Sequence, residues 1–254
     1  MARDSSGAHI YITTYMNNTL TTYTLSGKQT KPTITAGLNE PQSVAADANG
    51  TLYVIDYGNN SLTTYTPKGM QTSLTITGLD GPYGVAVDSN GKIYVTNQGT
   101  NSLTTYTPQG AQTTPTITGL DLPGGTRVDA SGKIYVANAG NNSVTTYKSD
   151  GSPTTPTITT GLDEPNDVAI GSTGNIYVTN YGNNTVTTYK ADGTQTTPTI
   201  TAGLSGPADI ALNAGKIYVV NRTSGTMTTY NSKGKQIKPT ITGLTQGATG
   251  IAIH

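Results

Sequence analysis

The chain has 254 residues, of which 33% are hydrophobic and only 11% are charged, and it contains no Cys, Trp or Phe. A chain of this length can bury a sizeable core, and its uniform composition favours one repetitive domain over two globular ones. Its formal net charge is zero, so it lacks the global basic field that draws proteins onto nucleic acid, and we expect no nucleic-acid partner. The absence of Cys excludes disulfides, thiolate metal sites and Cys nucleophiles.

The sequence contains few features that indicate the cellular location of the protein. No apolar run approaches the roughly 18 residues that cross a bilayer, so we expect no membrane span. Residues 1–7 lack the charged-then-apolar order of a signal peptide. The chain is therefore either cytoplasmic or a mature chain that carries a new Met. The abundance of Thr, Asn and Gly favours the second alternative, a protein that is secreted, periplasmic or on the cell surface.

Regularly spaced prolines reveal an internal repeat of about 41 residues. They are separated by 41, 41, 42 and 42 positions: Pro41, Pro82, Pro123, Pro165 and Pro207. The clearest copy, residues 81–120, holds four segments rich in β-branched residues and Tyr, which predict strands A (84–88), B (92–97), C (102–106) and D (115–120). Gly, Asn and Asp separate these segments. Four strands in about 40 residues are typical of a β-propeller blade.

The two chain ends together supply one further copy of the repeat. Residues 245–254 contain only a strand A, and residues 4–38 contain only strands B, C and D. We therefore predict a single all-β domain, 1–254, that forms a six-bladed β-propeller with four antiparallel strands per blade. Its closure, by pairing the last strand with the first, removes free sheet edges. The predicted blades are residues 245–254 plus 4–38, 39–79, 80–120, 121–162, 163–204 and 205–244.

The stretch GVAVDSNGKIYVTNQGTNSL, residues 84–103, resembles the NHL repeat. The YVTN segments at 94–97 and 177–180 also resemble the YVTN repeat of bacterial and archaeal surface propellers. This resemblance covers nearly the whole chain and implies a propeller fold. It implies little about function, because such propellers include protein-binding modules, RNA-binding modules, kinase sensor domains and enzymes.

Four of the sixteen tyrosines break the repeat. The other twelve recur in strand B or at the end of strand C, where aromatic residues pack in sheets. The exceptions are Tyr15, Tyr57, Tyr83 and Tyr181. In a propeller the D-to-A and B-to-C turns share one face, here named the top, and all four fall on it. They either pack on neighbouring turns or contact a ligand, since exposed aromatic residues are enriched at recognition surfaces.

Charges separate along the propeller axis. All eleven Lys map to the opposite, bottom face or to the strand ends beside it, whereas most acidic residues map to the top with only Arg127 and Arg222 against them. The acidic, tyrosine-bearing top is suited to cations, basic peptides or sugars. It is unsuited to RNA, which requires a basic surface.

Strand A contains the most specific departures from the repeat. One position is occupied in successive blades by Ser43, Gly84, Gly125, Asp167, Asp209 and Gly250. The two carboxylates at the channel mouth can hold a divalent cation, share a proton or pair with Arg127. Arg127 stands where the other five blades have Ala, and we expect it to pair with Asp167. A structural salt bridge is the alternative to a binding site.

These observations favour a non-catalytic binding or scaffold propeller, monomeric and without a cofactor. We expect its top face to bind a small molecule, a carbohydrate or a basic peptide. The expected ligand-binding residues are Tyr15, Tyr57, Tyr83, Tyr181, Arg127, Asp167, Asp209 and Arg222.

The alternative is a metal-dependent lyase or lactone hydrolase with its site at the channel mouth. The fold resembles virginiamycin B lyases, which use loop His residues and a divalent metal, but this chain has only His9 and His254, both expected at the bottom closure. Gluconolactonase-like propellers hold an axial metal with Glu, Asn and Asp. Here Asn166, Asp167 and Asp209 supply part of such a set, and no Glu matches.

Overall fold

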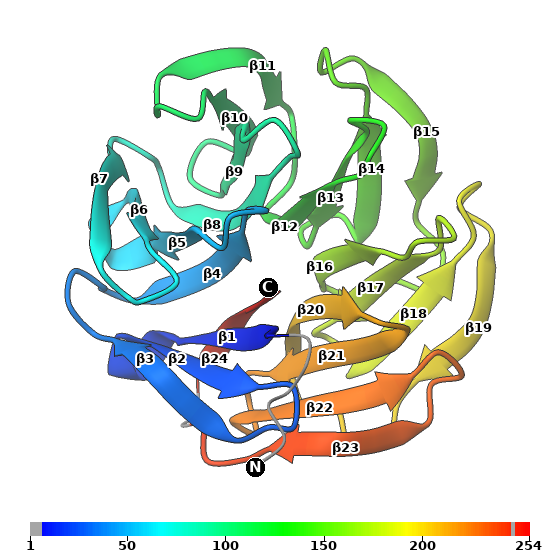
Figure 1. Ribbon diagram of the computed structural model, residues 1–254. Coiled ribbons are helices and arrows are strands. Elements are labelled where there is room, and N and C mark those ends of the chain that lie inside the picture. Colours follow the sequence, from blue (N-terminus) through cyan, green and yellow to red (C-terminus); the bar gives the residue numbers. More distant parts are fainter. Residues whose placement is uncertain (1–6, 245–246) are drawn as a thin grey trace.

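The structure is a ring of six four-stranded antiparallel sheets around a central axis (Figure 1). It is a computed structural model that describes residues 7–244 and 247–254. The predicted six-bladed β-propeller is confirmed. Residues 4–6 and 245–246, which the sequence assigns to the first blade, lie outside the described residues.

Each blade runs from strand A at the axis to strand D at the rim. Blade 1 consists of β24 (Ala248–Ile253), β1 (His9–Thr14), β2 (Thr19–Thr24) and β3 (Gln29–Ile34). Blade 2 consists of β4 (Pro41–Ala46), β5 (Leu52–Asp56), β6 (Ser61–Tyr65) and β7 (Gln71–Ile76). Blade 3 consists of β8 (Pro82–Val87), β9 (Ile93–Asn97), β10 (Ser102–Tyr106) and β11 (Gln112–Thr118).

The other three blades repeat this order. Blade 4 consists of β12 (Pro123–Val128), β13 (Ile134–Asn138), β14 (Ser143–Tyr147) and β15 (Pro153–Ile158). Blade 5 consists of β16 (Pro165–Ile170), β17 (Ile176–Asn180), β18 (Thr185–Tyr189) and β19 (Gln195–Ile200). Blade 6 consists of β20 (Pro207–Asn213), β21 (Lys216–Asn221), β22 (Thr226–Asn231) and β23 (Gln236–Ile241). Two short 3₁₀ turns, η1 (Tyr15–Asn17) and η2 (Tyr57–Asn59), follow β1 and β5.

The ring closes where β24 pairs antiparallel with β1. Ile253 lies opposite Ile10, and Ile251 lies opposite Ile12. His9 and His254 extend the pairing, because each backbone N–H donates to the carbonyl of the other, at 2.5 and 3.0 Å. The closure and the proximity of the two histidines are therefore as predicted.

The hydrophobic core is divided among the spaces between neighbouring blades. Between blades 1 and 2, for example, Leu20 and Ile34 pack with Val44, Val54 and Tyr65. All twelve tyrosines that obey the repeat are buried, with at most 9% of each exposed, as a scaffold role requires. Because both faces of every blade contribute to such a cluster, each blade depends on its two neighbours.

Asparagines in the B-to-C turns join successive blades on the top face. Each adopts a left-handed backbone conformation, and its side-chain oxygen accepts a hydrogen bond of 2.6–3.0 Å from a backbone N–H of the next blade. They are Asn18, Asn60, Asn101, Asn142 and Asn184. Asn tolerates this conformation better than most residues, so turn chemistry explains the frequent Asn of these turns.

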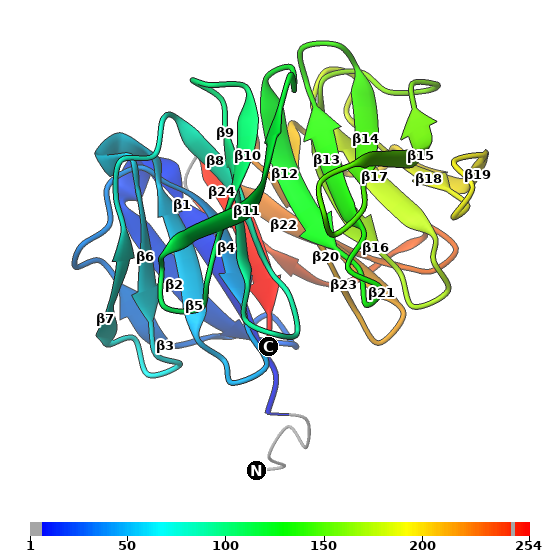
Figure 2. The same ribbon diagram turned by 90° about the horizontal axis from the view of Figure 1, so that it is seen from above.

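The six A strands surround the axis (Figure 1), and the side view shows β24 running down to the C-terminus at the bottom face (Figure 2). In blade 2, Pro41 pairs with Asp56 next to the B-to-C turn, whereas Ala46 pairs with Leu52 next to the A-to-B turn. Residues equivalent to 41–43 therefore surround the upper channel, and residues equivalent to 44–46 surround the lower channel.

A chain that ends at Gly247, and so lacks β24, should be severely destabilised and should oligomerise. The deletion exposes the backbone edge of β1 and removes Ala248 and Ile251 from the core between blades 6 and 1. Thermal melting and light scattering coupled to size exclusion measure both effects. His254→Ala, which keeps the backbone pairing, should remain a monomer with nearly the wild-type melting temperature. A truncated protein that behaved like this control would contradict the observed closure.

Candidate functional site

A pocket of about 200 Å³, here named the top pocket, lies on the top face at the channel mouth. Its lining residues come from the ends of B strands and from the starts of A strands. They are Tyr15, Tyr57, Gln98 and Arg222 from the first group, and Gln42 and Tyr83 from the second. The structure thus brings together three of the four irregular tyrosines and one of the two irregular arginines.

The fourth irregular tyrosine, Tyr181, lines an adjoining pocket of about 280 Å³, here named the side pocket. Tyr15 and Arg222 line both pockets and therefore lie between them. Met16, one of the few large apolar side chains that are well exposed, lines the side pocket as well. The two pockets form one continuous candidate site around Arg222.

Arg222 is the main charged group of this site. Its guanidinium carbon lies 5.5 Å from the centre of the Tyr15 ring, in a cation–π arrangement. Within residues 7–244 and 247–254, its side chain makes no hydrogen bond or ion pair. Burial and the nearby Glu40 carboxylate raise the pKa of Tyr15, so its hydroxyl stays protonated at neutral pH. The site therefore offers an unpaired guanidinium to a ligand, whereas the Tyr15 hydroxyl donates to the Glu40 carboxylate.

A side-chain bridge spans the channel below the top pocket. The Tyr83 hydroxyl of blade 3 and the Asn166 amide of blade 5 hydrogen-bond at 2.8 and 3.2 Å. Gly124 of the intervening blade makes room for this approach, because a Cβ there would clash with the backbone oxygen of Asn166. Tyr83 is thus fixed by a partner two blades away.

Beneath the bridge lies a small polar space, here named the inner chamber. Gln42, Tyr83 and Asn166 line it together with Asp167 and Asp209. Its volume of about 10 Å³ corresponds to roughly one water molecule. Two of its buried oxygens, Gln42 Oε1 and Asp167 Oδ1, have no hydrogen-bond partner in the described part of the chain.

The floor of the chamber is an Arg–Asp–Asp cluster. Arg127 Nη2 donates to Asp167 Oδ2 at 2.8 Å and to Asp209 Oδ1 at 2.9 Å. The backbone amide of Ile210 also donates to both carboxylates, and that of Ile251 donates to Asp209 Oδ2. The predicted Arg127–Asp167 ion pair is therefore present, and Asp209 is a second carboxylate partner of Arg127.

Burial controls the protonation of this cluster. Burial raises the pKa of Asp167 well above its usual value; Arg127 opposes this effect and Asp209 adds to it. Burial lowers the pKa of Arg127, but the two carboxylates more than offset this and leave that pKa raised. Arg127 thus stays charged, and the cluster is neutral when Asp167 holds a proton and carries one negative charge otherwise.

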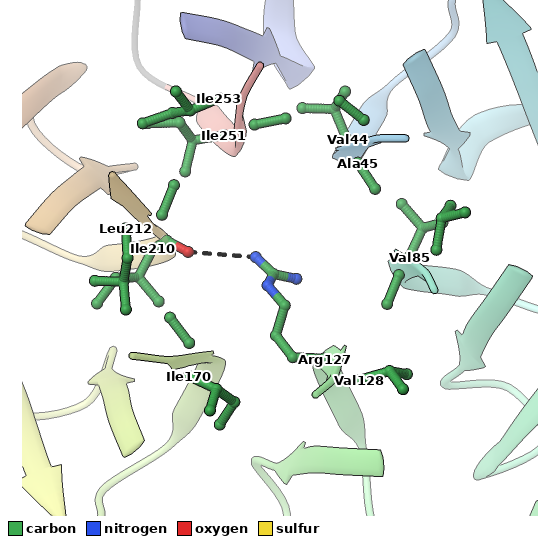
Figure 3. Close-up of a pocket in the computed structure, with 16 residues that line it drawn as sticks. Val44, Ala45, Val85, Arg127, Val128, Ile170, Ile210, Leu212, Ile251 and Ile253 are labelled. Carbon is green, nitrogen blue, oxygen red and sulfur yellow. Dashed lines mark hydrogen bonds between the residues drawn. The ribbon is translucent and has the colours of Figure 1, made fainter. Parts of the chain in front are cut away.

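Arg127 does not lie on the top face, where its sequence position suggests that it should. Its side chain extends inside the channel among the apolar ends of the A strands (Figure 3). Asp167 and Asp209 line the inner chamber, below the top pocket. Of the eight predicted binding residues, five surround the two surface pockets and three form the cluster beneath them.

Sequence reasoning missed Gln42 and Gln98, and it named Asn166 only as a candidate ligand in the lactone-hydrolase alternative. The signal that identifies them is variation between repeat copies at two positions. The position after the Pro that starts strand A holds Gln42, Tyr83, Gly124, Asn166 and Ala208, with Thr249 in blade 1. The position after strand B holds Tyr15, Tyr57, Gln98, Ala139, Tyr181 and Arg222. Every residue that lines the top pocket belongs to one of these two sets.

No three His, Cys, Asp or Glu side chains among the described residues are placed to hold one metal ion. His9 and His254 lie together at the bottom closure, away from the top pocket. Across the same residues, no helix is long and apolar enough to span a membrane.

Comparison with known families matches two segments of the chain to the NHL repeat, residues 38–65 and 162–189. These segments cover strands A to C of blades 2 and 5, in the positions that a propeller requires. The chain is a β-propeller with NHL repeats in two of its blades. No curated protein sequence matches it.

Solved structures similar to this propeller share its fold at low sequence identity. A chain of a nidogen/laminin complex has a TM-score of 0.82 at 18% identity, with 97% of this chain and 98% of that chain covered. A Bacteroides caccae protein of unknown function has a TM-score of 0.78 at 15% identity, with 97% and 98% covered. Virginiamycin B lyase from Staphylococcus aureus has a TM-score of 0.70 at 16% identity, with 95% and 82% covered. The similarity includes both a binding complex and an enzyme, so it establishes the fold alone.

Asp56, next to Tyr57, should make stability depend on pH. Burial raises its pKa from 3.8 to about 6. The folded protein therefore binds more protons between these values, and its stability falls as the pH rises through this window. Blades 3 to 6 have Asn here; Asn97, for example, donates to the Val95 carbonyl at 3.3 Å and to Thr104 at 3.0 Å. Asp56→Asn should raise the free energy of unfolding at pH 7 by about 1–3 kcal/mol.

Urea unfolding at pH 4, 5, 6 and 7 tests this effect. The difference between Asp56→Asn and the wild type should grow with pH. The matched variant Asn97→Asp buries a new carboxylate in blade 3 and should lose stability over the same window. Parallel pH profiles for the wild type and Asp56→Asn would contradict the raised pKa.

Arg127→Ala should cost about 3–5 kcal/mol of unfolding free energy, because it leaves two buried carboxylates without a cation. The triple variant Arg127→Ala, Asp167→Gly, Asp209→Gly restores residues that other blades carry at these positions. It should recover at least half of that loss in urea unfolding. A triple variant less stable than the single one would show that the acids stabilise the ring without the arginine.

Proposed function

We propose that this chain is an exported, non-catalytic binding propeller that takes a carbohydrate in its top pocket and side pocket. One observation carries the proposal: the four tyrosines that break an otherwise regular repeat line two adjoining pockets around Arg222. Scaffold residues recur in every blade, so residues that vary between copies and gather at one place are the best candidates for recognition. The Thr-, Asn- and Gly-rich composition supports export.

The chemistry of the top pocket suits a sugar ring. Tyrosine offers a flat apolar face together with a polar tip. Tyr15 and Tyr57 supply two such faces, while Gln42, Gln98 and Arg222 supply donors and acceptors for hydroxyl groups. A few polar groups within an aromatic lining are typical of small-ligand sites.

Charge favours a sugar over a basic peptide in this pocket. The acidic residues of the top face, such as Asp80, Asp121 and Asp163, belong to the D-to-A loops of the individual blades. The guanidinium between the two pockets forms no ion pair among the described residues and would repel a lysine or arginine side chain. The Glu40 carboxylate, which is engaged by the Tyr15 hydroxyl, offsets only part of this charge. A neutral ligand with many hydroxyl groups avoids this repulsion.

Calorimetric titration with cellohexaose, xylohexaose and chitohexaose tests the proposal. We expect at least one of them to bind, and Tyr57→Ala and Tyr15→Ala each to weaken that binding at least tenfold, about 1.4 kcal/mol. Tyr57 is 37% exposed, so Tyr57→Ala should leave the melting temperature almost unchanged. Met70→Ala, which removes a 62% exposed side chain from a bottom turn, is the matched control and should bind like the wild type.

Two results would contradict the proposal. The first is binding that all three substitutions leave unchanged, because the site would then lie elsewhere. The second is binding of oligolysine, lost in Tyr57→Ala, without binding of any oligosaccharide, because the ligand of the top pocket would then be a basic peptide.

The rival function is that of a metal-dependent lyase or lactone hydrolase. The structural similarity to virginiamycin B lyase favours it, and Asn166, Asp167 and Asp209 are its candidate ligands for a divalent cation. A melting temperature that rises with calcium, magnesium, manganese or zinc, together with turnover of a streptogramin or a sugar lactone that Asp167→Asn abolishes, would support this function. An unchanged melting temperature with every ion would exclude it.

A further inference from the structure

The lower half of the channel contains a cavity of about 240 Å³, here named the lower cavity. All six A strands line it, and every lining residue is Val, Ala, Ile or Leu except Arg127. It is separate from the top pocket, which shares none of its lining residues. Figure 3 shows the guanidinium of Arg127 extending toward β20 across this apolar ring, with a hydrogen bond of 3.3 Å to the Ile210 carbonyl.

The strands line the cavity in tiers. The middle tier is small, with Ala45, Ala86, Ala169, Ala211 and Ala252 beside Arg127. The tier nearest the bottom face is larger, with Ala46, Val87, Val128, Ile170, Leu212 and Ile253, all partly exposed. The small side chains of the middle tier leave room for a compact apolar molecule inside the channel.

Arg127 provides the polar end of the cavity. Its Nη2 donates hydrogen bonds to Asp167, Asp209 and the Ile210 carbonyl. Its Nη1 donates to the Thr126 carbonyl at 2.9 Å. Its Nε has no acceptor in the described part of the chain. The side chain is 23% exposed, and it lines the lower cavity. A ligand that accepts a hydrogen bond can therefore satisfy the remaining guanidinium donors.

The charge of the cluster selects among such ligands. Two carboxylates face one guanidinium, so the inner end of the cavity is neutral or carries one negative charge. A carboxylate ligand would meet no net positive charge and would lose its hydration in an apolar channel. A cationic ligand would meet the donor groups of Arg127. A neutral carbonyl or hydroxyl avoids both costs.

We propose that the lower cavity is a second binding site, for a small neutral molecule with an apolar body and one hydrogen-bond acceptor directed at Arg127. Its volume lies just below the roughly 300–1,000 Å³ of pockets that hold drug-sized ligands, so the body is about the size of one six-membered ring. Such a ligand touches several blades at once and stabilises the closed ring, because it binds only the folded protein.

Methyl NMR of the Ile, Val and Leu side chains tests this site with three probes that share one ring: cyclohexanone, cyclohexanecarboxylate and cyclohexylammonium. Cyclohexanone should shift the methyl signals of Val85, Ile210 and Ile251 in a saturable way. It should also bind at least tenfold more tightly than either charged probe. Tighter binding of cyclohexanecarboxylate, or no saturable shift with any of the three probes, would overturn the proposal.

Variants distinguish a binding site from a structural salt bridge inside a water-filled channel. Ala211→Leu fills the middle tier and should weaken cyclohexanone binding at least tenfold while keeping or raising the melting temperature. Ala111→Leu, on an exposed turn, is the matched control and should bind normally. The triple variant Arg127→Ala, Asp167→Gly, Asp209→Gly should lose the preference for cyclohexanone over cyclohexene. If that preference persists in the triple variant, Arg127 does not recognise the ligand, and the proposal fails.

Discussion

The antiparallel pairing of β24 with β1 is the constraint on which the rest of the molecule depends. It joins the two ends of the chain into one blade and holds six A strands around a common axis. The core lies between blades, so no blade completes its packing without the closed ring. The top pocket and the lower cavity both exist only because strands from different blades meet at the axis. Binding at either site therefore depends on closure, although neither is made by the closing strands alone.

The fold was predictable because every blade of a propeller repeats nearly the same sequence pattern. Each blade needs the same Tyr in strand B, the same Tyr at the end of strand C and a turn residue able to adopt the left-handed conformation, which is Asn in five blades and Gly225 in blade 6. The Pro spacing set the number of blades, and the incomplete copies at the two ends indicated how the ring closes. Packing and turn requirements that recur from blade to blade produce a periodic residue pattern, which is visible in a single sequence.

The sites were only partly predictable, since they consist of residues that differ between copies. Tyr15, Tyr57, Tyr83, Tyr181 and Arg222 stand out because they are large or charged. Gln42 and Gln98 resemble ordinary turn residues until all six copies are compared. The pairing of Arg127 with Asp167 follows from charge alone, but the position of Arg127 inside the channel does not. Arg127 lies opposite Tyr135 just as Ala86 lies opposite Tyr94, but the sequence does not show how its long side chain extends within the channel.

The central claim is that twelve tyrosines build the ring and four recognise a ligand. Fluorine NMR of protein labelled with 3-fluorotyrosine tests it most directly, with signals assigned by single Tyr→Phe substitutions. When the oligosaccharide that binds is added, only the signals of Tyr15, Tyr57, Tyr83 and Tyr181 should shift. Shifts confined to tyrosines of strands B and C, with these four signals unmoved, would contradict the account.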